Sequence, residues 1–338
     1  MKIKLVFLCL LVLFLFNGCG YFSLLSNEEW KDKSSAYDND VDIYVVGTYE
    51  STAVPCCWKN GERFDLEHPS GTATYAKSIC IEGEDIYVGG YIQYSPLKAC
   101  FWKNGKLTTV QSTNYSAASM IYSIKCINGV IYACGQDNGQ ASLWINDKVY
   151  ILPGPTSSYQ AWAITIDEAT LDFYIAGACY ISGILYPCYW KNGKDCKVVG
   201  ASNGAAFSID YKNGNLLIGG RYNGTSMGYW VNERYVQILA SGGCFYGIKY
   251  YKDDIYTTGY AGSAIAYCYK NLTMLPLIQP ATYNYCYAID VYNNDVYVAG
   301  SYTTTDSYAF YQKNGAITYL EPSSVAYANG IIVLPKKK

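Results

Sequence analysis

The side chains best suited to acid–base chemistry are five carboxylates in polar segments rich in Gly, Ser and Thr. They are Glu50, Glu67, Asp137, Asp306 and Glu321. Glycoside hydrolysis needs two carboxyl groups about 5–10 Å apart, and nothing in the sequence brings two of these five together. We therefore expect solvated loop residues. A carbohydrate-active enzyme, whose carboxylates would converge only in the folded chain, is the alternative.

Other catalytic patterns are missing from the sequence. His68 is the only histidine, so a Ser-His-Asp triad or a histidine-based metal site would depend on it alone. The chain contains no G-x-S-x-G, H-E-x-x-H, phosphate-binding or EF-hand motif. The sequence thus predicts no catalytic residue, no metal site and no cofactor, and it favours a binding module over an enzyme.

The 14 cysteines do not form a recognisable disulfide or metal motif. Cys56, Cys100 and Cys188 each stand two residues before a tryptophan in a repeated segment, and Cys134 occupies a position that other copies fill with Gly or Ala. No C-x-x-C pair is present. We expect mostly free thiols that act as small buried apolar residues. Whether any of them pair stays open.

The N-terminus reads as a targeting segment. A basic MKIK precedes an apolar run, Leu5–Phe16, which is shorter than the roughly 20 residues that a membrane-spanning helix needs. Phe16-Asn17-Gly18-Cys19 resembles a relaxed bacterial lipobox, although a plain signal peptide cut elsewhere is the alternative. We expect a lipoprotein signal peptide at 1–18, lipid on Cys19, and a flexible tether at 19–40. The protein would then be anchored to a bacterial membrane of the cell envelope, on the periplasmic side or the cell surface.

Bulk composition excludes one class of partner. A formal net charge of −2 over 338 residues offers no basic surface for nucleic acid. Charged residues make up only 15% of the chain, whereas tyrosine occurs 38 times.

The chain repeats a short pattern seven times. An apolar-aromatic run ends in glycine every 39–45 residues, and an aromatic turn of the WKNG type follows each run. The runs are DIYVVG (42–47), DIYVGG (85–90), VIYACG (130–135), DFYIAG (172–177), NLLIGG (215–220), DIYTTG (254–259) and DVYVAG (295–300). Asn-Gly is typical of tight β-hairpins, so WKNG predicts the hairpin between the third and fourth strands of each unit.

Four antiparallel strands in about 40–45 residues, repeated around an axis, are typical of a β-propeller. The first unit lacks its first strand, and residues 328–334 near the C-terminus look like a spare copy of it. We predict an all-β, seven-bladed β-propeller over 41–338, closed by the C-terminal strand in the first blade. An open solenoid is the structural alternative.

The repeats resemble the tandem β-propeller repeats of bacterial exported proteins, with DVYVAG and YWKNG as hallmarks. The resemblance covers residues 41 to about 334, and the marks of WD, kelch and Asp-box propellers are missing. It implies the fold and export, and no particular activity.

Tyrosines follow the repeated glycine, where we expect the loop from the second to the third strand to begin on one face of the propeller. They are Tyr49, Tyr91, Tyr180, Tyr222, Tyr260 and Tyr302. With neighbouring Ser, Thr and Asn they resemble a paratope in composition and would suit a glycan or protein ligand; packing between blades is the competing interpretation. We expect a monomeric binding or scaffold module, bound to membrane lipid through Cys19. A structural envelope protein without a specific ligand is the further alternative.

Overall fold

The computed structural model describes residues 40–155, 159–201, 203–239, 242–262, 264–321 and 324–337. The predicted signal peptide, Cys19 and the predicted tether up to residue 39 lie outside these residues. Every regular element in the described ranges is a β-strand. None of the described residues belongs to a helix long and apolar enough to cross a membrane.

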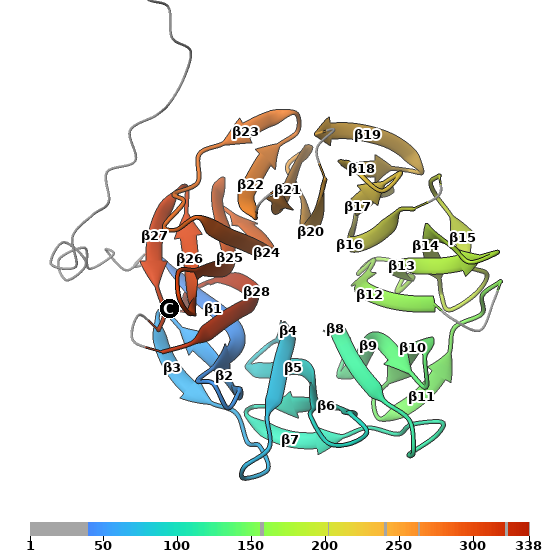
Figure 1. Cartoon of the computed structure of the whole chain (residues 1–338), viewed down its shortest axis with the longest axis horizontal. Helices are drawn as coiled ribbons and strands as arrows, with labels where there is room; N and C mark the ends of the chain where they lie inside the picture. The colour runs from blue at the N-terminus through green and yellow to red at the C-terminus, as the bar shows by residue number, and fades with distance from the viewer. Residues whose placement is uncertain are drawn as a thin grey trace, which may run out of the picture. The chain divides into compact units, whose positions relative to one another are not determined.

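The strands form seven four-stranded antiparallel sheets around a central channel, as Figure 1 shows. Each innermost strand contacts the innermost strands of both neighbouring blades, which makes a complete circle. The predicted seven-bladed β-propeller is thus confirmed. We number the blades along the chain, so that blade 1 holds β28, β1, β2 and β3, and blade 4 holds β12 to β15.

Each blade has four strands that run from the channel to the outer edge. The innermost strands are β4 (Thr74–Glu82), β8 (Ser119–Ile127), β12 (Tyr159–Ile166), β16 (Ala205–Lys212), β20 (Gly243–Tyr251), β24 (Tyr283–Tyr292) and β28 (Ala326–Pro335). The second strands are β1 (Val41–Tyr49), β5 (Asp85–Ile92), β9 (Val130–Asp137), β13 (Phe173–Ile181), β17 (Asn215–Tyr222), β21 (Asp254–Ala261) and β25 (Asp295–Thr303). The third strands are β2 (Val54–Lys59), β6 (Lys98–Lys103), β10 (Gln140–Ile145), β14 (Ile184–Lys191), β18 (Ser226–Val231), β22 (Ile265–Lys270) and β26 (Ser307–Lys313). The outer strands are β3 (Glu62–Asp65), β7 (Lys106–Thr109), β11 (Lys148–Ile151), β15 (Lys197–Val198), β19 (Arg234–Leu239), β23 (Thr273–Leu275) and β27 (Ala316–Tyr319).

The C-terminal strand closes the ring, as predicted. β28 pairs antiparallel with β1, from Val41 opposite Pro335 to Tyr49 opposite Ala326. Its apolar side chains are buried between blades 1 and 7 together with those of β1. Closure removes the free edges that β1 and an unpaired β28 would otherwise expose.

The recurring Asp and KNG residues form one hydrogen-bonded unit in five blades. In blade 1, Asn60 has a φ of 51° and Gly61 a φ of 84°, the backbone of a tight hairpin. The Asn60 side chain accepts the backbone N–H of Ile43 at 2.8 Å and donates to Asp42 at 2.9 Å. The Lys59 ammonium lies 2.9 Å from the same carboxylate. We call this unit the Asp–Lys–Asn clip, and it ties the third-to-fourth strand hairpin to the start of the second strand.

The other clips repeat the same contacts. They consist of Asp85, Lys103 and Asn104; Asp172, Lys191 and Asn192; Asp254, Lys270 and Asn271; and Asp295, Lys313 and Asn314.

The repeated tryptophan of the third strand holds the connector that enters its blade. In blades 2, 3 and 4 the fully buried indole donates to a connector carbonyl at 2.6–2.8 Å. The pairs are Trp102 with Glu67, Trp144 with Gln111, and Trp190 with Pro153. In blade 7, Gln312 takes this place and binds both backbone groups of Ile278. The repeated aromatic therefore positions the connectors that border one face of the propeller.

Candidate functional site: a ring of bulged residues around the channel

Each innermost strand carries one residue more than the second strand that pairs with it. In blade 2, Ala76 lies opposite Gly90 and Ser78 opposite Gly89, so Lys77 between them has no partner. Such a β-bulge occurs in all seven blades at the same position. The bulged residues are Lys77, Tyr122, Trp162, Phe207, Tyr246, Tyr287 and Asn329. We call these seven residues the channel ring.

The repeated glycine of the second strand makes room for the bulge. A Cβ on Gly90 would lie 1.9 Å from the carbonyl oxygen of Tyr75 in the bulged strand, far inside a van der Waals contact. The corresponding glycines of the other six blades meet the equivalent carbonyl at 1.7–2.1 Å. The glycine that defines the repeat is therefore required by the bulge that places a side chain at the channel.

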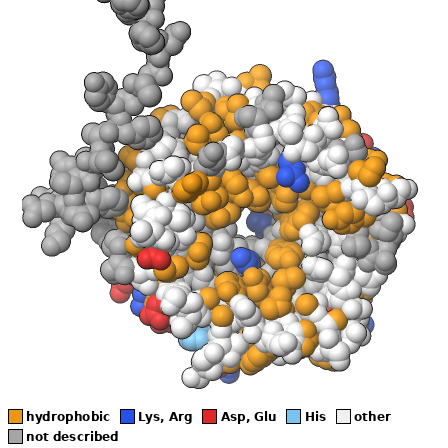
Figure 2. All heavy atoms as spheres, viewed as in Figure 1, with side chains coloured by type: hydrophobic (Ala, Val, Ile, Leu, Met, Phe, Trp, Pro, Cys, Tyr) orange, Lys and Arg blue, Asp and Glu red, His pale blue; other side chains and the backbone are white. Residues whose placement is uncertain are grey.

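The channel ring is aromatic over five consecutive blades, from Tyr122 to Tyr287, and the last four of these side chains contact one another in sequence. The ring centroids of Trp162 and Phe207 are 4.7 Å apart, those of Phe207 and Tyr246 are 5.0 Å apart, and those of Tyr246 and Tyr287 are 6.0 Å apart. All seven members are half-buried, as expected of side chains that line an opening. Figure 2 shows hydrophobic side chains around the central opening, with Lys or Arg side chains inside it. The ring thus combines half-buried aromatic side chains with amine, amide and phenol groups.

Two of the six tyrosines predicted as ligand contacts pack beside members of the channel ring. Tyr91 stacks on Tyr75 with 5.0 Å between centroids, and its ring lies 5.8 Å from the Lys77 ammonium. Tyr260 stacks on Tyr246 at 5.2 Å, and their hydroxyl oxygens are 3.2 Å apart. Both tyrosines follow the repeated glycine by one residue.

The other four predicted tyrosines lie elsewhere. Tyr49, Tyr222 and Tyr302 follow the glycine by two residues, and side chains one residue apart point to opposite faces of a strand. Tyr49 and Tyr302 are only 7% and 4% exposed, and Tyr222 packs against Trp230. Tyr180, near the end of β13, is 39% exposed. The tyrosines one residue after the repeated glycine therefore lie beside the channel ring, whereas those two residues after it point to the opposite face of the strand.

None of the seven members of the channel ring was predicted from the sequence. The first strand of each unit was treated as regular, and the bulged position was not singled out. The sequence does contain a signal for this position. The first strand of each unit holds a small residue followed by Ile, and in five copies the residue directly before this pair is aromatic. These residues are Tyr122, Trp162, Phe207, Tyr246 and Tyr287.

The channel ring is poor in charge. Burial raises the pKa of Tyr91 to about 12 and also raises the pKa values of Tyr246 and Tyr287, so these phenols stay protonated near neutral pH. Burial lowers the pKa of Lys77, the only ring member with an ionisable amine. The phenols can therefore donate hydrogen bonds as neutral groups.

Further along β20 and β24 the innermost strands carry charges. The Lys249 ammonium lies 2.9 Å from the Asp290 carboxylate, and attraction to that carboxylate raises the pKa of Lys249. The second Asp290 oxygen accepts the backbone N–H of Val333 at 2.9 Å. This ion pair links blades 6, 7 and 1, so it has a structural role.

Asp137, one of the five carboxylates considered above, is completely buried. It accepts hydrogen bonds from the Ser112 hydroxyl at 2.6 Å and from the backbone N–H of Thr113 at 2.8 Å. These contacts hold the connector between blades 2 and 3, so Asp137 has a structural role there.

The other four carboxylates lie in different surroundings. Glu321 forms an ion pair with Arg63 at 2.7 Å, and Glu67 accepts a backbone N–H of blade 2 at 2.9 Å. Glu50 and Asp306 are exposed turn residues. His68 is half-buried beside the carbonyl of its own connector.

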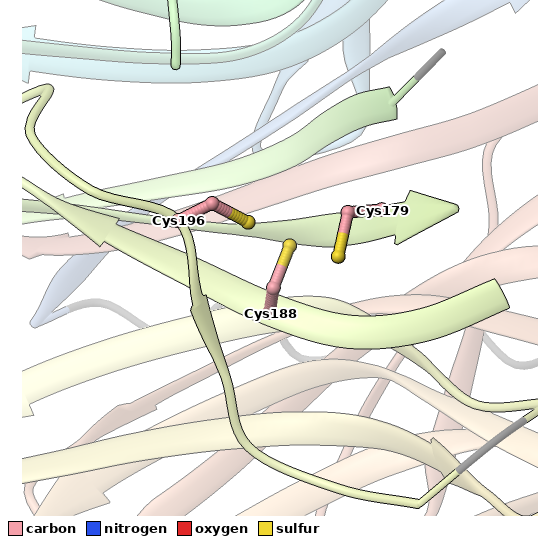
Figure 3. A group of neighbouring side chains, drawn as sticks. All are labelled: Cys179, Cys188 and Cys196. Carbon is pink, nitrogen blue, oxygen red and sulfur yellow. The ribbon is translucent and has the colours of Figure 1, made fainter. Parts of the chain in front are cut away.

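A second group of reactive side chains lies inside blade 4, where its first member, Cys179, directly precedes the predicted Tyr180. The sulfur atoms of Cys179, Cys188 and Cys196 all lie within 4.8 Å of one another, as Figure 3 shows. They are free thiols, as are the other nine cysteines of the described ranges. Sequence reasoning missed this group because its members are eight and nine residues apart and match no metal-binding spacing.

Comparison with known proteins adds the fold alone. No protein-family model matches the chain, and no curated protein matches it. The WD40 β-propeller domain of Doa1 is similar in structure, with 14% identity, a TM-score of 0.48, and coverage of 86% of this chain and 93% of that domain. A protein of unknown function from Bacteroides thetaiotaomicron has 11% identity, a TM-score of 0.41, and coverage of 87% and 91%. A Trypanosoma rangeli sialidase has 8% identity, a TM-score of 0.38, and coverage of 84% of this chain and 49% of the sialidase. Similarities this distant indicate no activity.

Proposed function

We propose that this protein is a binding module whose channel ring recognises a glycan. The observation that carries the proposal is the ring itself, because seven bulges at one position place seven half-buried side chains, five of them aromatic, around a single opening. Recognition sites typically combine apolar and aromatic walls with a few fixed polar groups.

The chemistry of the ring suits a neutral sugar. Aromatic rings can pack against the C–H faces of pyranose rings, and Trp162, Phe207 and Tyr246 form a row of three neighbouring, mutually tilted rings. Protonated phenols, the Lys77 ammonium and the Asn329 amide can hydrogen-bond to sugar hydroxyls. Asn329 already donates to the carbonyl of Ala76 at 2.8 Å, which fixes its orientation.

We also propose that lipid on Cys19 holds the module at a bacterial cell envelope. The lipobox-like sequence around Cys19 and the apolar run before it support this proposal. Metabolic labelling with a radioactive fatty acid tests it. We expect label on the wild-type chain and none on Cys19→Ala, whereas equal labelling of both would reject the anchor.

A glycan array tests the binding proposal with the full-length chain in detergent. We expect binding to a defined subset of oligosaccharides and a clear loss of signal in Trp162→Ala and Tyr246→Ala. Tyr115→Ala is the matched control, because Tyr115 is 65% exposed in a connector and is not a member of the ring. No binding by the wild type, or equal loss in the control, would contradict the proposal. Selective binding of peptides in place of sugars would also count against it.

A further inference from the structure

The cysteine cluster of blade 4 is built from three adjacent chain segments. Cys179 lies in β13, Cys188 in β14, and Cys196 directly before β15. Cys179 and Cys188 are fully buried and Cys196 is half-buried. All three side chains lie on the face of blade 4 that packs with apolar residues of blade 3.

The strand register does not favour a disulfide. Cys179 lies opposite Tyr186, two residues from Cys188, and Cys188 lies opposite Val198, two residues from Cys196. Diagonal neighbours of this kind have Cα atoms about 7–8 Å apart, whereas disulfides usually need about 4.4–6.8 Å. Cys179 and Cys196 are farther apart still, because β14 lies between their segments.

A metal ion bound between the three sulfur atoms does not need the short Cα–Cα distances of a disulfide. Three sulfur atoms that each lie about 2.3 Å from one metal ion are about 4 Å from one another. The sulfurs of the cluster are already within 4.8 Å, so small side-chain rotations would suffice. The group contains sulfur donors only, with no carboxylate or imidazole.

We propose that Cys179, Cys188 and Cys196 form a three-thiolate binding site for a thiophilic closed-shell metal ion, Zn(II) or Cu(I). Soft thiolate ligands select these ions over Mg(II), Ca(II) and Mn(II). The three thiols give up their protons to solvent when the ion binds, so Zn(II) reduces the site's charge to −1 and Cu(I) reduces it to −2. The bound ion would link three strands of blade 4, including the two-residue outer strand β15.

The repeat supplies a matched control for this site. Cys100 lies opposite Gly90 in blade 2, and Cys188 lies opposite Gly177 in blade 4, so the two cysteines occupy the same position of the blade. Both are completely buried. Cys100 belongs to no group of three donors among the residues that the structure describes.

The test is a metal titration of the reduced, metal-free full-length chain in detergent, with Zn(II) in one arm and Cu(I) under anaerobic conditions in the other. A chromophoric chelator competes for the ion and reports the dissociation constant. We expect one tight equivalent of at least one of the two ions. Cys188→Ser should weaken it at least about 100-fold, the upper range for changes beside a metal site, and Cys100→Ser should leave it unchanged.

X-ray absorption of the loaded wild-type chain keeps the proposal testable if Cys188→Ser fails to fold. Three sulfur neighbours around the metal are expected. Fewer than three, equal losses in both serine variants, or no tight equivalent of either ion would overturn the proposal. A disulfide between two of the three cysteines in the chain as isolated would overturn it as well.

Discussion

Trp162 is half-buried at the channel, whereas the other five tryptophans of the described residues are fully buried in third strands. The difference follows from backbone pairing. A tryptophan in a regular third strand points between two blades, but Trp162 is the unpaired residue of a bulge and so takes a place in the channel ring. The same residue type is therefore structural in one position and available to a ligand in the other.

Asp137 allows a test of a buried carboxylate at the scale of one residue. Asp137→Asn keeps the shape but removes the charge that strengthens the bonds from Ser112 and Thr113. We expect the free energy of unfolding to fall by about 1–3 kcal/mol, measured by urea denaturation. Asp306→Asn, at an exposed turn, should change it by less than about 0.5 kcal/mol. Equal effects of the two changes would contradict the structural role of Asp137.

Two adjacent glycines in β5 should respond differently to the same substitution. Gly90→Ala would place a methyl group on the Tyr75 carbonyl and disturb the bulge. We expect a loss of about 1–3 kcal/mol or more in the free energy of unfolding. Gly89→Ala should cost less, because its Cβ would meet side-chain carbons of Ile121 and Ile124, at 2.6 and 3.2 Å, in place of a backbone carbonyl, and because other blades carry Cys134 or Ala176 at this position. Thermal unfolding of the two variants decides the matter, and the opposite order would show that the bulge does not constrain this glycine.

The Asp–Lys–Asn clips should make stability depend on pH on the acid side. The pKa of the aspartate is lowered in four of the five clips; at Asp42 burial opposes the hydrogen bonds from Asn60 and Lys59, whereas at the other three the hydrogen bonds dominate. The partners with the largest effect are Lys103 for Asp85, Asn192 for Asp172 and Lys270 for Asp254. A carboxyl with a lowered pKa in the folded chain contributes stability that is complete above the ordinary aspartate pKa of about 3.9. That contribution is lost as the pH falls through the lowered value.

We therefore expect the urea concentration at the unfolding midpoint to decrease when the pH is lowered below about 4. The triple variant with Asp85, Asp172 and Asp254 changed to Asn should show a smaller drop than the wild type. An identical drop in the triple variant would show that the clips do not contribute to the acid response.

At the scale of elements, the sequence predicts strands and hairpins, because these depend on local residue patterns. It does not predict bulges or contacts between strands, because these depend on which residues pair. Asn60-Gly61 identifies its hairpin because both residues adopt positive φ. The bulge at Lys77 depends on which residues of β5 lie opposite, and alternation along β4 alone does not reveal it. The proximity of Cys179 and Cys188 likewise follows from a diagonal register across the β13–β14 hairpin.

The closure of the ring was predictable because the missing first strand and the surplus last strand are both visible in the repeat. Deleting residues 326–338 removes β28, exposes the edge of β1 and uncovers apolar side chains of β1 such as Val45. We expect the shortened chain to unfold at markedly lower urea concentration and to self-associate. Deletion of residues 336–338 alone is the matched control. Size-exclusion chromatography and urea unfolding check both, and a stable monomer without β28 would contradict the closure.

The most direct test of the proposed function is the fluorescence of Trp162 during titration of the full-length chain with an oligosaccharide selected on the array. We expect a saturable change in the wild type that disappears in Trp162→Phe, although this variant keeps an aromatic face and still binds. Tyr246→Ala should weaken binding about two- to tenfold, the range for loss of one aromatic contact. Undiminished binding by Tyr246→Ala, together with the same fluorescence change in Trp162→Phe, would contradict recognition at the channel ring.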